Sequence, residues 1–167
     1  MSTSSRPLVI HGWSIFTHPL FVGQVETLID EVERARAKDP SGYVRRNAAK
    51  RLAAITRLAF EIILQDPTRP EYRQGDTLGD ARKHWLRAKF FQQYRLFFRY
   101  SAANRVIVLA WVNDDRTLRA YESASDAYRV FRRMLDRGAP PDDWDRLMRE
   151  AAAAGGEFLG LAERLSR

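Results

Sequence analysis

Apolar residues recur at helical spacing in the first third of the chain. A helix is predicted from Pro19 to about Lys38, and its apolar positions, at spacings close to three and four, are Leu20, Val25, Leu28 and Val32. A second helix is predicted from about residue 43 to residue 64, with an apolar face formed by Val44, Ala48, Leu52, Ile55, Ala59 and Ile62. Because only the turn sequence DPSG separates them, the two helices should form an antiparallel hairpin.

Strand patterns follow a loop at residues 66–82, which contains two prolines and two glycines. Three strands are predicted, at about residues 85–90, 94–100 and 105–112, with a tight turn at residues 101–104. The third strand reads RVIVLAWV and is apolar on both faces, which predicts a central strand covered on both sides. Nearer the N-terminus, Val9, Ile10 and Trp13 indicate a short strand or extended segment.

Helical spacing returns in the last third of the chain. A helix capped by Ser125 or Asp126 should run to about Asp136, with inward-pointing side chains at Tyr128, Phe131 and Leu135. A further helix should begin near Asp142 and end in the alanines and glycines of residues 151–156. The final stretch EFLGLAERLSR is compatible with a short helix.

The loop between the first two predicted strands decides which side chains share a face, because strand faces alternate. A two-residue loop, Gln92-Gln93, places Lys89 and Arg95 on opposite faces, whereas a three-residue loop that includes Phe91 pairs them. We predict the three-residue loop because it separates apolar from cationic side chains almost completely. The cationic face then contains Arg87, Lys89, Arg95, Phe97 and Arg99, and the apolar face contains Leu86, Ala88, Phe90, Tyr94, Leu96, Phe98 and Tyr100.

The cationic face has two interpretations. Residues 82–100 contain six Arg or Lys and no acidic residue. Like charges opposite one another destabilise a strand pair by up to ~1 kcal/mol each. The face is therefore either fully solvated or it holds an anion, and we favour the anion because four cations gather there.

Charge and composition narrow the choice of partner. The formal net charge is +7, which favours nucleic acid, an anionic membrane or an acidic protein, and basic residues alternating with aromatics favour nucleic acid. The sequence has no cysteine, no apolar run of the ~18 residues that a membrane span needs and no secretory signal. We expect a soluble cytoplasmic protein that has no membrane partner.

The sequence shows few signatures of other catalytic chemistry. Its histidines, His11, His18 and His84, lack metal-ligand spacing, so we expect no metal and no cofactor. His84 is either a general base or an ordinary exposed histidine. Phosphodiester cleavage in RNA needs no protein nucleophile, because the substrate supplies its 2′-hydroxyl. Arg and Lys stabilise the phosphorane charge, and Tyr or a lysine crowded by cations can move protons.

Longer motifs carry a resemblance to a known family. The segments PEYRQGDTLG, HWLRAKFF, YRLFFRY, VIVLAWVNDDRTLRAY and SDAYRVFRRMLDRG occur in this order, with HGWSIFTHPLF before them and RGAPPDDW after them. Together they resemble the YhaV-type toxins of bacterial type II toxin–antitoxin systems, within the RelE-like superfamily. The resemblance runs from about His11 to Glu150 and implies three parts: a loose segment 1–10, a toxin domain 11–150 and a tail 151–167.

The resemblance implies a fold and an activity. The fold is α+β, RelE-like, with two N-terminal helices packed on a small antiparallel sheet and C-terminal helices after it. The activity is that of a metal-independent endoribonuclease, an mRNA interferase that cuts mRNA on the ribosome. The expected partner is an AbrB-type antitoxin, which blocks the toxin and binds the operator DNA, so that this chain meets operator DNA only through it.

The resemblance also assigns site residues one by one. Arg87 and Lys89 stand where RelE-like toxins carry basic residues before the Tyr-Arg-Leu motif, and Arg95 is the motif arginine. Arg119 and Tyr121 match an arginine and a tyrosine beyond the third strand. The implied roles are phosphate charge for Arg95 and Arg119, base or transition-state stabilisation for Lys89, positioning for Arg87, and proton transfer or base stacking for Tyr121.

Further cations are candidates for RNA binding, and two rival functions remain open. The RNA-binding candidates are Arg82, Lys83, Arg99, Arg46, Lys50 and Arg57; the last three lie on the second predicted helix and either bind ribosomal RNA or form a solvated face. One rival function is a non-catalytic nucleic-acid-binding module or operon co-repressor. The other is a pure interaction protein with a basic cleft for an acidic partner.

Overall fold

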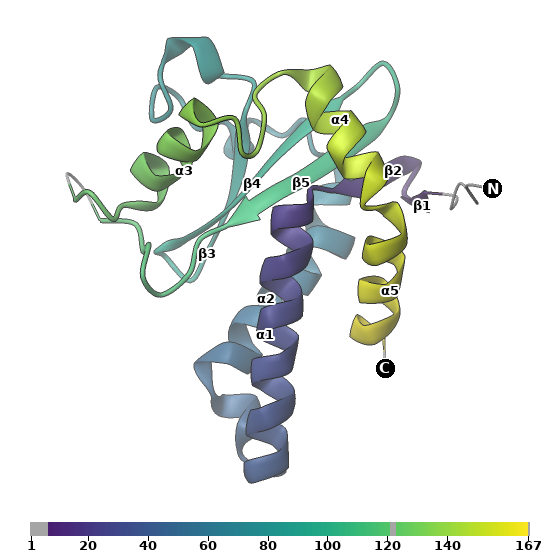
Figure 1. The fold of residues 1–167 in the computed structure, drawn as a ribbon, viewed down its shortest axis with the longest axis vertical. Helices are drawn as coiled ribbons and strands as arrows, with labels where there is room; N and C mark the ends of the chain where they lie inside the picture. Colours follow the sequence, from purple (N-terminus) through teal and green to yellow (C-terminus); the bar gives the residue numbers. More distant parts are fainter. Residues whose placement is uncertain (1–6, 121–122, 167) are drawn as a thin grey trace.

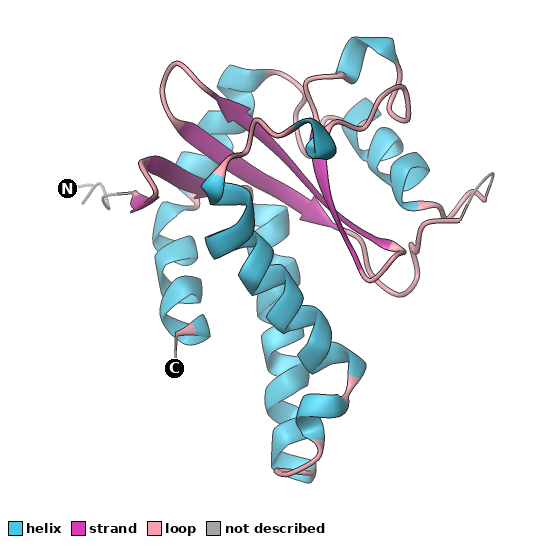
Figure 2. Ribbon diagram, turned by 180° about the vertical axis from the view of Figure 1, so that it is seen from behind, coloured by secondary structure: helices cyan, strands magenta, loops and turns pink. Residues whose placement is uncertain are grey.

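A five-stranded sheet with the order β1-β2-β5-β4-β3 organises the α+β fold (Figures 1 and 2). The computed structural model describes residues 7–120 and 123–166. The strands are β1 (Leu8–Ile10), β2 (Trp13–Thr17), β3 (Leu86–Phe90), β4 (Tyr94–Ser101) and β5 (Val106–Val112). The central position of β5 confirms the prediction from its apolar sequence, and all but its first residue are buried.

The expected element order was wrong at the N-terminus. Strands β1 and β2 precede the first helix, and β2 pairs in parallel with β5, so the sheet is mixed rather than antiparallel. Strand β2 alternates buried and half-buried residues, with Trp13 and Ile15 facing the core. Its pairing of Ser14 with Val106 joins segments far apart in the chain, which local periodicity does not reveal.

The predicted helical hairpin is present. Helix α1 (Pro19–Lys38) lies antiparallel beside α2 (Asn47–Arg57), which is flanked by a 3-10 turn (Tyr43–Arg45), a π turn (Leu58–Ile62) and a second 3-10 turn (Ile63–Gln65). Ile55 and Ala59 are buried as predicted. Val44, which was placed on the same apolar face, is instead 56% exposed, because the 3-10 turn rotates it out of the α2 register.

The three-residue hairpin loop is confirmed. Phe90 pairs with Tyr94 and Lys89 pairs with Arg95, so the cationic side chains share one face of β3 and β4. Phe91 and Gln92 have left-handed backbone conformations, with φ of 46° and 63°. Such conformations are unfavourable for residues other than glycine, so the surrounding contacts must hold the loop in this shape.

Each face of the sheet carries its own apolar layer. On one side, β3 and β4 contribute Leu86, Ala88, Phe90, Leu96 and Phe98 to a core shared with α1 and α2. On the other, α3 (Ala127–Asp136) and α4 (Trp144–Ala153) cover the face that the sequence suggested was open. Phe97 is 0% exposed and stacks on Phe131 of α3, with ring centroids 4.2 Å apart. The cations therefore surround a second core.

The last helix closes the first core. Helix α5 (Gly155–Leu165) buries Phe158 and Leu161 against the layer below the sheet, and its C-terminal end lies beside α1 (Figure 1). None of the helices formed by the described residues combines the length and apolar character that crossing a bilayer requires.

Phe97→Ala should lower the free energy of unfolding by about 3–5 kcal/mol, because it removes a ring packed between the sheet and α3. Phe91→Ala is the matched control in the same hairpin, since that ring is 52% exposed, and it should change stability by less than ~0.5 kcal/mol. Urea unfolding followed by circular dichroism measures both. If both substitutions changed the free energy of unfolding equally, this would contradict the burial of Phe97 between the sheet and α3.

Because of His18, the stability of the protein should decrease in mild acid. Burial lowers the pKa of His18 below its ordinary value of 6.5, against the opposing hydrogen bond and charge of Glu150. The unfolded chain then binds the proton more readily than the folded protein does. The contribution of His18 to stability is therefore complete above pH 6.5 and is lost as the pH falls below that value. His18→Asn keeps a capping side chain for α1 and should make the free energy of unfolding, measured by urea unfolding at a series of pH values, depend less on pH below pH 6.5. If the free energy of unfolding of the wild-type protein depended on pH as little as that of the variant, this would contradict the lowered pKa of His18.

Candidate active site

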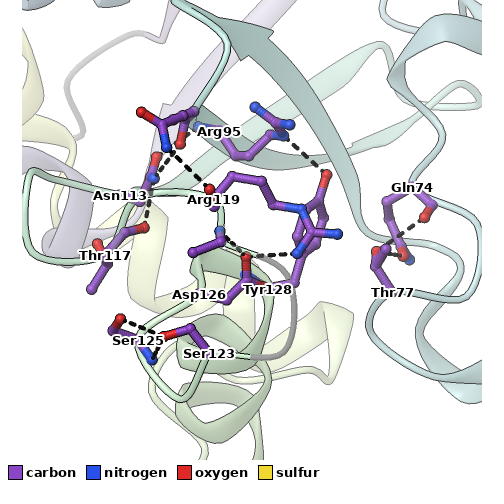
Figure 3. Close-up of polar contacts among 12 residues, drawn as sticks. Gln74, Thr77, Arg95, Asn113, Thr117, Arg119, Ser123, Ser125, Asp126 and Tyr128 are labelled. Carbon is purple, nitrogen blue, oxygen red and sulfur yellow. Dashed lines mark hydrogen bonds and ion pairs between the residues drawn. The ribbon is translucent and has the colours of Figure 1, made fainter.

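Tyr128 gathers arginines from different parts of the chain, and Figure 3 shows two of them, Arg95 at its hydroxyl and Arg119 beside its ring. Arg87 donates from Nε to the hydroxyl oxygen over 2.9 Å, and Arg95 donates from Nε over 3.1 Å. The guanidinium of Arg119 lies over the Tyr128 ring, 4.7 Å from its centroid. A buried tyrosine with bound guanidinium groups at its edge and on its face fixes their relative positions.

The hairpin register delivers the first two arginines. Arg87 on β3 and Arg95 on β4 share the face that meets α3, and Tyr128 lies in the first turn of that helix. Arg87 also donates from Nη1 to the carbonyl of Glu71 over 2.6 Å. Arg95 is only 6% exposed, and its Nη1 donates to the carbonyls of Gln92 and Tyr94. Arg95 thus forms the floor of the site and holds the hairpin loop.

Arg119 reaches the site through the cap of α3. Its Nη1 pairs with Oδ1 of Asp126 over 2.6 Å, and Asp126 is almost fully buried at the N-cap of α3. The same carboxylate accepts from the backbone of Ala120 and of Tyr128. Because these bonds tie the carboxylate to both segments, the cap that begins α3 also sets the position of Arg119.

Asn113 joins the hairpin loop to the segment that carries Arg119 (Figure 3). Its Oδ1 accepts from the backbone of Arg95 over 2.6 Å, and its Nδ2 donates to the carbonyls of Gln93 and Thr117 over 2.9 and 2.8 Å. The backbone of Arg119 in turn donates to the carbonyl of Gln93. Asn113 is fully buried, so these bonds form without competition from water.

Lys89 is the exposed cation of the site. It lies opposite Arg95 in the hairpin, and its side chain makes no hydrogen bond or ion pair with any residue in the described ranges. The buried carboxylate of Asp126 offsets only one of the charges of Lys89, Arg87, Arg95 and Arg119. The site therefore keeps a net positive charge that suits a phosphate, and Lys89 is the cation most accessible to it.

The other candidates on this side of the sheet lie near the C-terminal end of α3. Arg82 pairs with Asp136 over 2.8 Å, and Lys83 lies 3.3 Å from Asp76. The guanidinium of Arg99 lies between the rings of Trp85 and Trp144, and burial lowers the pKa of Arg99. The structure places these cations in ion pairs or between aromatic rings.

His84 belongs to that second group of residues. Its Nε2 lies 2.8 Å from Asp142, whose carboxylate also accepts from the indole of Trp85 over 2.7 Å. Although burial acts to raise it, these hydrogen bonds hold the pKa of Asp142 below its usual range. Asp136 lies at the end of α3 and Asp142 beyond it, whereas Tyr128 lies in the first turn, about 12 Å from Asp136 along the helix axis. His84 is therefore not among the residues that Tyr128 gathers.

The remaining candidates fall elsewhere. Arg46, Lys50 and Arg57 are exposed on the helical hairpin, which projects away from the sheet (Figure 1). Tyr121 lies outside the described residues. Within those residues, no group of three or more His, Asp or Glu side chains is arranged as metal ligands would be.

Sequence reasoning overlooked the residues that organise the site. Tyr128 was predicted to point inward, which is correct, but its hydroxyl was given no role; Asp126 was recognised only as a helix cap. Asn113 appeared as part of a turn after the third strand. A polar residue directly after a wholly apolar strand, here Asn113 after Val112, is the signal that would have identified it.

Comparisons with known proteins give the family of this chain. A family model described as a toxin with endonuclease activity, of a toxin–antitoxin system, matches residues 15–152. The ribonuclease toxin YhaV of Escherichia coli (strain K12) is 45% identical over 146 residues, which cover 86% of this chain and 95% of that protein. Toxin YhaV of Escherichia coli O157:H7 gives the same values, and that of strain CFT073 is 44% identical. No solved structure matches the chain. On this evidence the chain belongs to the YhaV family of toxins, endonucleases of toxin–antitoxin systems.

Proposed function

We propose that this protein is a metal-independent endoribonuclease that cuts mRNA on the translating ribosome. The observation that supports this most directly is the cluster of Arg87, Arg95 and Arg119 around Tyr128, with the exposed Lys89 beside it. The family supplies the endonuclease activity, and the relative named ribonuclease toxin makes RNA the substrate of choice.

The geometry supports cleavage by the substrate's own 2′-hydroxyl. In this mechanism the 2′-oxygen loses its proton and bonds to phosphorus, the bond from phosphorus to the 5′-oxygen breaks, and that oxygen takes up a proton. The products are a 2′,3′-cyclic phosphate and a 5′-hydroxyl end. The protein must orient the phosphate and offset the additional negative charge of the phosphorane.

Exposed and buried residues have different roles in this mechanism. Lys89 contacts the scissile phosphate and either takes the 2′-hydroxyl proton or offsets the phosphorane charge. Arg87 and Arg119 are fixed by Tyr128 and Asp126, so they stabilise that charge without reorganising during the reaction. Arg95 carries phosphate charge from the floor of the site, and Tyr121 remains a prediction for proton transfer or base stacking.

The proposal includes the setting in which the enzyme acts. We propose a cytoplasmic toxin whose antitoxin is of the AbrB type, and operator DNA is bound only through that antitoxin. Arg82, Lys83 and Arg99 are proposed to follow the RNA backbone toward the far end of α3. The alternative is a non-catalytic nucleic-acid-binding protein, which the net charge of +7 also favours.

Lys89→Ala should reduce mRNA cleavage by about 10²-fold, because it removes the positive charge that contacts the scissile phosphate. Mapping 5′-hydroxyl RNA ends after induction measures it, with and without a block of translation to test ribosome dependence. Arg149→Ala, at an exposed position on α4, is the matched control and should cleave like wild type. If the wild-type protein creates no new ends, the chain is a binding module rather than a nuclease.

Tyr128→Phe should keep the ring and lose the acceptor that Arg87 and Arg95 share. We expect the rate constant of cleavage in single-turnover assays to fall at least ~10-fold, while RNA affinity changes much less, because the cations remain but are no longer positioned. The stability cost should be about 1–2 kcal/mol. An unchanged cleavage rate in a folded variant would show that Tyr128 is only a packing residue.

A further inference from the structure

One segment of the helical hairpin, residues 34–60, is strongly basic. Residues 34–60 contain eight Arg or Lys and one acidic residue, Asp39, and their net charge of +7 equals that of the whole chain. The acidic residues of the same hairpin, Glu26, Asp30, Glu31, Glu33 and Glu61, lie just outside this segment. Arg82, Arg99 and Arg119 have carboxylate neighbours, whereas Lys50, like Lys89, makes no ion pair with any described residue.

A hollow with a mainly apolar floor runs along the outward side of α2. It has a volume of about 770 Å³, and its lining includes Val44, Ala49, Ala53, Phe60 and Leu165. Ala49, Ala53 and Phe60 recur at helical spacing, so they form one stripe along the hairpin. Val44, at 56% exposure, stands at one end of this stripe. The small side chains in the middle allow another backbone to approach closely.

A second hollow extends the first toward α1 and α5. Its volume is about 290 Å³, and the two share Val32, Tyr43, Leu52 and Leu165, so they form one continuous groove. We call this the hairpin groove. The C-terminal end of α5 forms one wall, where Arg164 is already paired with Asp30 and Glu33.

Cations line the apolar floor of the hairpin groove. Lys50 and Arg57 are exposed on α2, and both belong to the lining. They are seven residues apart, which is two helical turns or about 10 Å on one side of the helix. Arg57 has one exposed partner, Glu61, at 3.8 Å, a pair that contributes little in water.

This combination fits a protein helix better than an RNA backbone. Contacts with RNA phosphates need accessible cations but no apolar surface. A charged RNA backbone lying over the groove would leave its apolar floor exposed to water. An amphipathic helix places apolar side chains into a groove at helical spacing and leaves a polar edge beside it. With Lys50 and Arg57 along the rim, that polar edge should be acidic, with carboxylates about two turns apart.

We propose that the hairpin groove binds an acidic amphipathic helix of the antitoxin. This inference rests on the proposed function only in taking the partner from a toxin–antitoxin system. It implies that the antitoxin is anchored away from the Tyr128 cluster, on the part of the hairpin that projects from the sheet (Figure 1). Neutralisation and catalysis then depend on different residues and can be separated by mutation.

Ala53→Glu tests the floor of the groove. The residue is exposed on α2 and lines the hollow, so the change should leave the fold intact while placing a carboxylate where the apolar side of the partner helix would lie. The matched control is Ala152→Glu, the same substitution at an exposed position of α4. Each variant is expressed alone and together with the antitoxin encoded beside this gene, and growth is followed.

The expected result is that Ala53→Glu arrests growth as wild type does when alone, and still arrests it when the antitoxin is present. Ala152→Glu should be neutralised normally. With purified proteins, Ala53→Glu should bind the antitoxin roughly 10-fold more weakly or worse, and the double variant Lys50→Glu, Arg57→Glu should lose much of the salt dependence of binding.

Three results would overturn the proposal. Normal neutralisation and normal affinity of Ala53→Glu would show that the antitoxin does not occupy the groove. Loss of growth arrest by folded Ala53→Glu expressed alone would assign the groove to RNA or the ribosome. A change in oligomeric state by size-exclusion chromatography would assign it to a second copy of this chain. If wild type itself does not arrest growth, the proposed function fails, and the affinity measurement still decides the groove.

Discussion

The hydroxyl oxygen of Tyr128 is the point on which the candidate active site depends. It accepts one hydrogen bond from Arg87 and one from Arg95, and its ring supports Arg119. Like charges held this close would otherwise separate, so a common acceptor and a buried aromatic face are what keep them together. The hairpin register, the cap of α3 and the amide of Asn113 all act to bring these groups to that oxygen.

The second apolar core explains why a charged sheet face can also be stable. Phe97, between Arg95 and Arg99 on β4, is covered by Phe131 and packs against Trp111, so the centre of this face is apolar and the cations lie around it. Helix α3 thereby separates the cations into two groups, one at Tyr128 and one at Asp142. Only the first group contains an exposed cation directly opposite a buried one, Lys89 beside Arg95.

The net charge of the sequence pointed to nucleic acid, but its distribution in the fold gives it a second meaning. Arg46, Lys50 and Arg57 were candidates for ribosomal RNA, and the fold places Lys50 and Arg57 beside an apolar groove that no described part of the chain fills. Charge beside apolar surface is the pattern of a protein-binding site. In these two proposals the cations divide between a phosphate site on the sheet and a docking surface on the hairpin.

The sequence by itself determined the elements that depend on local periodicity: α1, α3 with a cap at Ser125 or Asp126, and the three-residue loop that pairs Lys89 with Arg95. Alternation and helical spacing act over neighbouring residues, so they can be read without the fold. Only the tertiary structure decided the parallel pairing of β2 with β5, the covering of the cationic face by α3, and the meeting of Arg119 with Tyr128. Those contacts join residues that local spacing does not relate, and the burial of apolar surface by the whole chain selects them.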